Sequence, residues 1–156
     1  MRKNTLERGM NAPDLVGNDG AGKPVSIADF RGRKLILFFY PKDNTPGCTA
    51  VACSLRDDMD ALRQAGYELL GVSPDSVRKH QNFSLKYDLP FRLLSDVDKK
   101  NAMSYGVWGM KKFMGRELMG ILRTTFLIDE NGRIEHVIRK VRTKDHARQI
   151  LELLAN

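Results

Sequence analysis

Residues 40–53 read YPKDNTPGCTAVAC, and the predicted elements of the chain are organised around this stretch. Residues 35–39 before it are all apolar, and so short an apolar run is typical of a strand buried on both faces. After it, the sequence predicts a helix over residues 46–65. Apolar side chains recur there with the spacing of one helical face, at Val51, Ala52, Leu55, Met59 and Leu62.

The start of this helix places a cysteine where a thiolate is favoured. Thr45 is a good N-cap, and Pro46 follows at the first helical position, where its missing N–H costs nothing. Cys48 then falls in the first turn, close to unpaired backbone N–H groups and the positive end of the helix dipole. Both features favour the ionised thiol, so Cys48 is predicted to be a nucleophile.

The chain has two cysteines, and Cys53 lies five residues after Cys48. On a helix this spacing turns the side chains about 140° apart and separates the Cα atoms by roughly 8–9 Å. A disulfide needs about 4.4–6.8 Å between Cα atoms. Cys48 lies at the edge of the apolar face, and Cys53 lies among Arg56, Asp57 and Asp60 on the polar face. If the two cysteines join, the first turns of the helix must unwind.

Other roles for these cysteines have less support. A free cysteine is often only a small core hydrophobe. That alternative is weaker for Cys48 than for Cys53, which faces away from the apolar stripe. A metal site fits poorly, because the spacing is not C-x2-C and because His80, His136 and His146 show no ligand spacing with the cysteines.

At these residues the sequence resembles a known family. Pro41, Thr45 and Cys48 match the P-x3-T-x2-C active-site signature of the peroxiredoxins. Residues 40–53 look like the bacterioferritin-comigratory, or peroxiredoxin Q, branch, in which a resolving cysteine follows the peroxidatic one by five positions. Similarity to that branch continues at residues 106–109, 113–115 and 123–129, so it covers nearly the whole chain.

The resemblance implies roles for five residues. Cys48 would be the peroxidatic nucleophile, Thr45 would hydrogen-bond its sulfur or the peroxide, and Pro41 would shield the thiolate from water. Arg123 would stabilise the thiolate and position the peroxide. Cys53 would condense with the sulfenic acid of Cys48 to give an intramolecular disulfide. From the residues alone, Thr45 is also explained as an N-cap, Pro41 as a strand end and Arg123 as a surface arginine.

The resemblance also implies the reaction and its partners. Such an enzyme is a thiol-dependent peroxidase that reduces hydrogen peroxide and organic hydroperoxides. An external dithiol, thioredoxin or a similar protein, would reduce its disulfide by thiol–disulfide exchange. No metal, flavin or haem is needed. We expect a monomer, with a dimer as the alternative.

Length and composition predict one globular domain over residues 1–156, with residues 1–9 loosely ordered. No signal peptide or membrane span is recognisable, so the cytoplasm is the expected location.

The formal net charge of +7 would permit nucleic-acid binding. No recognition motif or clustered basic stripe supports such binding, so neither nucleic acid nor a membrane is expected as a partner.

The order of the predicted elements indicates an α/β fold: a mixed sheet with helices on both faces, thioredoxin-like and of the peroxiredoxin type. Hairpins are predicted at residues 15–27, around an Asn-Asp-Gly turn, and at residues 123–138, around Asn131 and Gly132. Residues 106–122 show no clear period and are predicted to be a loop. The other expected elements are strands at 67–72 and 91–94, and helices opening at Ser73, at Lys99 and after a cap at Thr143.

Two other functions are compatible with parts of the pattern. A general dithiol–disulfide oxidoreductase would use C-x2-C and a cis-proline loop, but four residues separate the cysteines here and no proline follows Pro90. A basic binding or holdase module would act without catalysis. Catalytic peroxide consumption that depends on Cys48 would separate a peroxidase from both.

Overall fold

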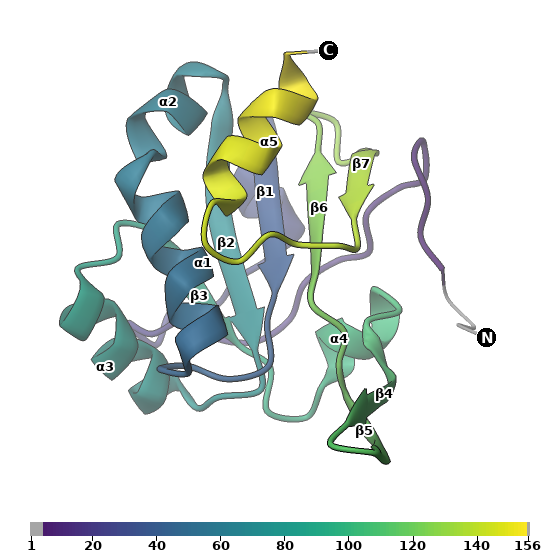
Figure 1. The fold of residues 1–156 in the computed structure, drawn as a ribbon. Coiled ribbons are helices and arrows are strands. Elements are labelled where there is room, and N and C mark those ends of the chain that lie inside the picture. Colours follow the sequence, from purple (N-terminus) through teal and green to yellow (C-terminus); the bar gives the residue numbers. More distant parts are fainter. Residues whose placement is uncertain (1–4, 156) are drawn as a thin grey trace.

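A five-stranded mixed sheet forms the centre of the structure, a computed structural model that describes residues 5–155 (Figure 1). The strand order is β3-β2-β1-β6-β7, in which β1, β2 and β3 run parallel and β6 is antiparallel to both β1 and β7. The central strand β1 is buried from its second residue onward, as its apolar run predicts. The strands span Lys34–Phe39 (β1), Tyr67–Ser73 (β2), Arg92–Ser95 (β3), Thr124–Ile128 (β6) and Ile134–Ile138 (β7).

Helices cover both faces of this sheet, which confirms the predicted fold class. Side chains alternate along β1, so Ile36 and Phe38 join the core on one face, and Leu35 and Leu37 join the core on the other. The first core is closed by α1 (Pro46–Asp57), α2 (Met59–Gln64), α3 (Val77–Tyr87) and α5 (His146–Leu154). The second is closed by α4 (Lys100–Ser104) and a 3-10 helix at Ile27–Phe30.

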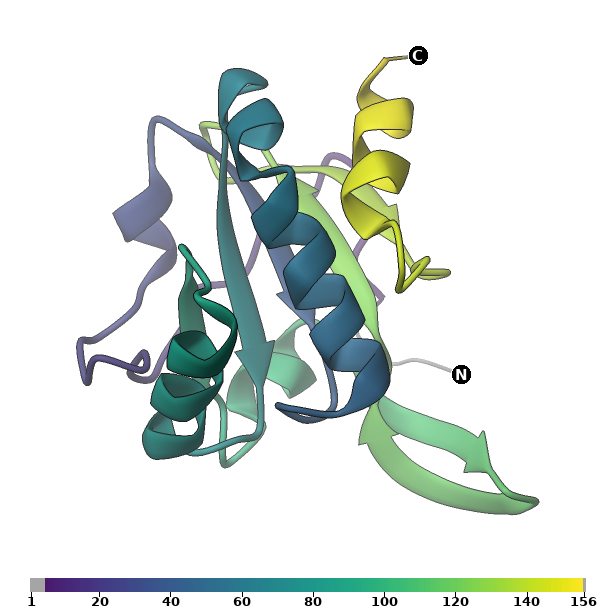
Figure 2. The same cartoon turned by 60° about the vertical axis from the view of Figure 1, so that its left-hand side comes forward.

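The helix predicted over residues 46–65 is divided in two at Asp58. The backbone leaves helical geometry there, with φ −108° and ψ 20°. Aspartate is a weak helix former in a helix interior, and two further aspartates, Asp57 and Asp60, lie within two residues. The Leu62 N–H still donates to the Asp58 carbonyl at 3.1 Å, so α2 continues close to the direction of α1 (Figure 2). The predicted apolar stripe is buried along both helices.

Two predicted helix starts are wrong by a few residues. Ser73 ends β2 and donates its hydroxyl to the Asp75 carboxylate at 2.6 Å, so it does not cap a helix. Ser76 is the N-cap of α3 instead. The last helix begins after Asp145 rather than after Thr143, because the backbone is still non-helical at Asp145, with φ −139°.

Residues 106–122 were predicted to be a loop, but they contain a β-hairpin. β4 (Trp108–Phe113) pairs antiparallel with β5 (Arg116–Ile121) across Met114 and Gly115, which have φ of 53° and 78°. Positive φ at both positions is typical of a tight two-residue hairpin turn. The hairpin projects from the body of the molecule (Figure 2). Much of its surface meets solvent, and Met114 is 87% exposed, so its strands carry no apolar alternation that reveals them in the sequence.

The two predicted turns have different outcomes. The hairpin at residues 123–138 is confirmed as β6 and β7, with Gly132 at φ 82° in its turn. The hairpin at residues 15–27 is reduced to one isolated bridge, between Asn18 and Pro24. Proline has no N–H to donate to a strand ladder, so the pairing does not extend.

The N-terminal segment is attached to the sheet where it is described. Residues 1–4 of the segment expected to be loosely ordered lie outside the described residues. Further along, the Gly9 N–H donates to the Ile134 carbonyl at 2.8 Å. Within residues 5–155, no helix combines the length and the hydrophobicity that crossing a membrane requires.

Candidate active site

The predicted nucleophile, Cys48, lies in the first turn of α1, shortly after the carboxyl end of β1. Thr45 is the N-cap and Pro46 the first helical residue, as the sequence predicts. The Thr45 hydroxyl makes no cap bond to α1 and instead donates to the Lys42 carbonyl at 2.9 Å. Cys48 is a free thiol with 3% of its surface exposed. The site is therefore built on a buried thiol at a helix start.

Arg123 is brought to this thiol from the other side of the central strand. It lies directly before β6, and its Nη2 atom donates to the Cys48 sulfur at 3.4 Å. Gly47 makes room for this contact, because a Cβ atom at that position would lie 3.2 Å from Nη2. A guanidinium beside sulfur favours the thiolate electrostatically. The pairing of Arg123 with Cys48, implied by resemblance alone, is present in the fold.

The second terminal nitrogen of Arg123 has no partner. Among residues 5–155, Nη1 of Arg123 is the one buried side-chain nitrogen or oxygen without a hydrogen bond. A buried donor left unpaired costs about 1–3 kcal/mol, so such groups are rare and need an explanation. Nη1 is bonded to the same carbon as the nitrogen that contacts Cys48. An acceptor atom bound beside the sulfur would satisfy it.

Cys53 is not brought to Cys48 in this structure. It is half-buried and a free thiol. Its neighbours on α1 contact the elements on either side: the Ser54 hydroxyl accepts from the Ala147 N–H at 3.1 Å, and Arg56 donates to the Tyr87 carbonyl at 2.7 Å. Because α1 is intact through both cysteines, their side chains leave the helix in divergent directions.

The remaining two predicted residues lie in the loop between β1 and α1. Pro41 is half-buried and directly follows Tyr40, and Thr45 is half-buried three residues before Cys48. Thr45 and Arg123 therefore lie at the start of α1, and Pro41 lies in the loop that leads to it. Their roles toward a peroxide stay predictions.

Sequence reasoning missed a buried hydrogen-bond network under this loop, which we call the Asp43 network: Tyr40, Asp43, Ser73, Asp75 and His80. The Asp43 carboxylate accepts from the Tyr40 hydroxyl at 2.5 Å and lies 2.7 Å from Nδ1 of His80. The Asp43 N–H donates to Asp75 at 2.7 Å. Burial and the neighbouring Asp43 carboxylate raise the pKa of Tyr40 well above its ordinary value, so its hydroxyl stays a donor. Asp43 and His80 lie 37 residues apart, and no local pattern links them.

Three members of the network could also be considered as metal ligands. Within the described part of the chain, one group of at least three His, Cys, Asp or Glu residues has its possible ligand atoms within 4.8 Å of one another. It consists of Asp43, Asp75 and His80. These atoms already hydrogen-bond to protein groups, since Nε2 of His80 lies 3.0 Å from the Leu94 carbonyl and Asp75 accepts from Ser73. We therefore interpret the group as a hydrogen-bond network rather than as a metal centre.

A second buried histidine, His146, lies at the start of α5 near Arg123. Its Nδ1 is 2.9 Å from the Gln149 side-chain oxygen, and its Nε2 is 2.8 Å from the Thr125 hydroxyl. The amide oxygen only accepts, so Nδ1 carries the proton and Nε2 accepts from Thr125. Burial, and to a lesser degree the positive charge of Arg123, lower the pKa of His146 from its ordinary value of 6.5.

This lowered pKa predicts a loss of stability on acidification. Below pH 6.5 the unfolded chain protonates His146 while the folded protein resists it, so the free energy of unfolding falls as the pH falls. One such proton contributes at most about 1.4 kcal/mol per pH unit. Urea unfolding at about pH 7.5 and about pH 5.5 measures the change. His146→Gln should reduce the loss, and an equal loss in this variant would contradict the assignment.

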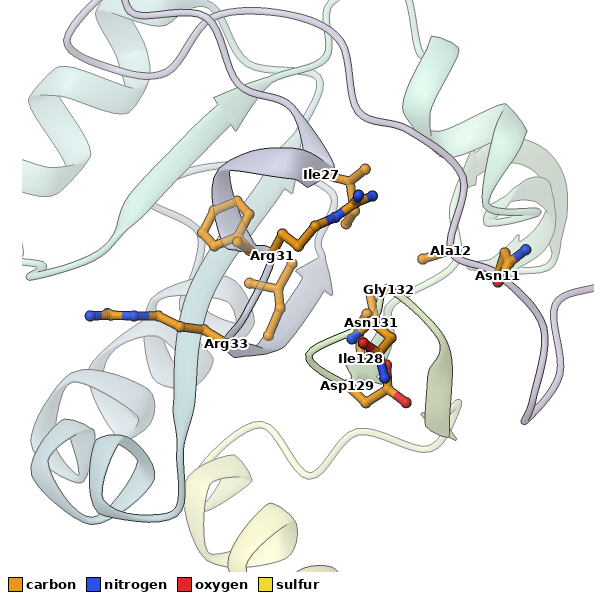
Figure 3. A pocket seen from close by; sticks show the side chains of 11 residues that line it. Asn11, Ala12, Ile27, Arg31, Arg33, Ile128, Asp129, Asn131 and Gly132 are labelled. Atoms are coloured by element: carbon orange, nitrogen blue, oxygen red, sulfur yellow. Dashed lines mark hydrogen bonds between the residues drawn. The ribbon is translucent and has the colours of Figure 1, made fainter.

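One cavity beside β1 lies at the end of the strand away from Cys48. It has a volume of about 300 Å³ and is lined by Phe30, Leu35 and Ile128, with Asn131 and Asp129 at its border (Figure 3). Arg33 extends away from these last two side chains and pairs with Glu68 at 2.9 Å. Cys48 instead follows the opposite end of β1, so this cavity is separate from the candidate site.

Comparison with known proteins matches residues 9–137 to the AhpC/TSA family. The chain is 46% identical over 150 residues to peroxiredoxin Bcp of Bacillus subtilis (strain 168), covering 96% of each chain. It is 45% identical over 151 residues to peroxiredoxin Bcp of Escherichia coli (strain K12), covering 97% of each. A solved structure of the Xanthomonas campestris bacterioferritin comigratory protein, described for alkyl peroxide reduction, matches 98% of both chains with a TM-score of 0.86 and 34% identity.

Proposed function

The chain belongs to the AhpC/TSA family and is a peroxiredoxin of the bacterioferritin-comigratory branch, and we propose that Cys48 is the nucleophile with which it reduces hydrogen peroxide and organic hydroperoxides. The observation that carries this assignment is the contact of Arg123 with the Cys48 sulfur, at 3.4 Å. Of the two cysteines, Cys48 has this contact and also lies at a helix start. Both features favour a thiolate.

The first step is attack of the Cys48 thiolate on the O–O bond of the peroxide. The S–O bond forms as the O–O bond breaks, which gives a sulfenic acid, and the departing oxygen takes a proton to leave as alcohol or water. The free Nη1 donor of Arg123 is the group that would hydrogen-bond a peroxide oxygen. The Thr45 hydroxyl donates its hydrogen bond to the Lys42 carbonyl, so its oxygen can accept a hydrogen bond from the peroxide O–H. Pro41 would exclude water from the thiolate.

The second step joins Cys53 to the sulfenic acid of Cys48, with loss of water, to give an intramolecular disulfide. The divergent directions of the two side chains require the first turns of α1 to unwind. Each backbone hydrogen bond lost costs about 0.5–1.5 kcal/mol net, so opening two turns costs a few kcal/mol. Leu55, and Met59 in α2, are buried beyond the break and would hold the rest of the helix on the sheet.

An external dithiol, thioredoxin or a similar protein, would then reduce the disulfide by thiol–disulfide exchange. Because both reacting cysteines belong to one chain, a monomer is sufficient for the whole cycle. The chemistry calls for no metal, flavin or haem. A pair of cysteines that must return to free thiols suits the reducing cytoplasm, which we propose as the location.

Thiol titration before and after one equivalent of peroxide tests this scheme. We expect both thiols to be lost together, with no change in monomer size on a non-reducing gel, because the new bond lies within the chain. Loss of one thiol alone would contradict the resolving role of Cys53. A disulfide-linked dimer on the gel would show that the bond forms between chains.

Amide hydrogen exchange on the same samples reports the unwinding. Residues 46–54 should exchange faster in the disulfide form than in the reduced form, whereas Leu55 and the turns after it should stay protected. An oxidised protein that holds the Cys48–Cys53 bond without faster exchange in α1 would contradict the proposed opening.

A further inference from the structure

The Asp43 network connects the loop before Cys48 to α3 and β3, two elements outside α1. His80 belongs to α3 and is fully buried. Its Nε2 lies 3.0 Å from the carbonyl of Leu94 in β3, and a carbonyl oxygen only accepts, so Nε2 carries a proton. Its Nδ1 lies 2.7 Å from the Asp43 carboxylate, and an ionised carboxylate only accepts, so in this ion pair both ring nitrogens donate. The imidazole therefore links the loop to the edge of the sheet.

Asp43 is held from its other sides as well. Its second carboxylate oxygen accepts from the Tyr40 hydroxyl at 2.5 Å. Its backbone N–H donates to Asp75 at 2.7 Å, and Asp75 also accepts from the Ser73 hydroxyl at 2.6 Å. All five residues of the network are buried. Hydrogen bonds to charged groups are stronger than neutral ones, and buried networks that are fully satisfied are rigid.

This anchored residue lies between the groups proposed to meet the peroxide. Pro41 is two residues before Asp43, and Thr45 is two residues after it. The Lys42 carbonyl, adjacent to Asp43, accepts from the Thr45 hydroxyl at 2.9 Å and so sets the direction of that oxygen. A shift of Asp43 would therefore move the Thr45 hydroxyl and the first turn of α1 relative to Arg123.

We propose that the hydrogen bonds of Asp43 to His80 and to Tyr40 form a positioning clamp for peroxide attack, with His80, Tyr40 and Asp43 as positioning residues that do not touch the substrate. The inference rests on the proposed role of Cys48 as the nucleophile. In that scheme the first turns of α1 unwind and refold in every catalytic cycle. Because α3 and β3 lie outside the segment that unwinds, the clamp keeps Asp43 in one position. The first turn of α1 can then refold in the same place in each cycle.

Two substitutions of His80 separate the bond to Asp43 from the bond to Leu94. An asparagine amide nitrogen can take the place of Nδ1, so His80→Asn keeps a donor toward Asp43. A glutamine amide nitrogen can take the place of Nε2, so His80→Gln keeps the donor toward Leu94 and loses the clamp. We expect the rate constant for Cys48 oxidation by hydrogen peroxide to fall by about 10- to 100-fold in His80→Gln. In His80→Asn it should stay within about threefold of the parent rate.

The rate is read by rapid mixing with hydrogen peroxide followed by thiol quenching, at peroxide concentrations that give the second-order constant. His136→Gln, in the edge strand β7, is the matched control for replacing a histidine. Urea unfolding of each variant shows that the folded state is retained. Tyr40→Phe removes one hydrogen bond to Asp43 and keeps the ring, so it provides a milder test if His80→Gln does not fold, and should slow the reaction by about 3- to 10-fold.

The outcomes distinguish the clamp from the proposed function. A folded His80→Gln that reacts at the parent rate overturns the clamp, and so does equal slowing of the asparagine and glutamine variants. Where His80→Gln does not fold, an unchanged rate in Tyr40→Phe overturns it. A parent protein whose Cys48 does not react with peroxide would instead overturn the proposed function.

Discussion

Replacing Cys48 with serine is expected to reduce peroxide consumption to the uncatalysed background. A serine hydroxyl at this position is not ionised at neutral pH and cannot form a sulfenic acid, so the first bond of the cycle does not form. Arg123 would still lie at the helix start, and the fold should be kept because the side chains are similar in size. The measurement is peroxide loss over time with a dithiol reductant present. Residual catalysis by the Cys48→Ser protein would contradict the assigned nucleophile.

The matched control is Cys53→Ser, which also replaces a cysteine sulfur with a hydroxyl oxygen but at the second cysteine. This variant should oxidise once per chain at close to the parent rate, because Cys48 and Arg123 are unchanged. It should not turn over with thioredoxin, since no disulfide forms. Its sulfenic acid should advance to sulfinic acid more readily, which mass spectrometry detects as two added oxygens. Normal turnover of Cys53→Ser with thioredoxin would contradict the resolving role.

Arg123→Met is expected to lower the rate constant for Cys48 oxidation by about 10²–10³-fold. The substitution removes the nitrogen 3.4 Å from the sulfur and the buried Nη1 donor that we assign to the peroxide. Because Nη1 is unpaired in the reduced protein, its removal takes away an unfavourable group. We therefore expect the urea midpoint of the reduced variant to equal or exceed that of the parent, although the reaction is slower.

Arg123→Lys distinguishes charge from geometry. A lysine ammonium can pair with the thiolate, but it has no planar second nitrogen to replace Nη1. We expect its oxidation rate to lie between those of the parent and Arg123→Met. A lysine variant as fast as the parent would contradict the role of Nη1, and a fast, folded Arg123→Met would contradict the role of the arginine altogether.

The local structure around the nucleophile could be read from the sequence because each signal acts over a few residues. The apolar run of β1, the cap at Thr45, the proline at Pro46 and the apolar stripe of α1 each limit the backbone within one or two turns. The β6–β7 hairpin was predictable for the same reason, since Gly132 supplies the positive φ of its turn. Arg123 was found by family resemblance and not by any local pattern.

Local sequence is therefore enough to predict the strand, loop and helix that carry Cys48, and the separation of the two thiols on that helix. The rest of the site forms only when distant segments fold together. Arg123 reaches Cys48 across 75 residues because β6 pairs with β1, and His80 reaches Asp43 across 37 residues because α3 packs beside the loop. The exposed hairpin of β4 and β5 is held by pairing of one strand with the other rather than by an apolar face. The contacts of Arg123 with Cys48 and of His80 with Asp43 depend on distant segments meeting in the fold, and no short stretch of sequence encodes them.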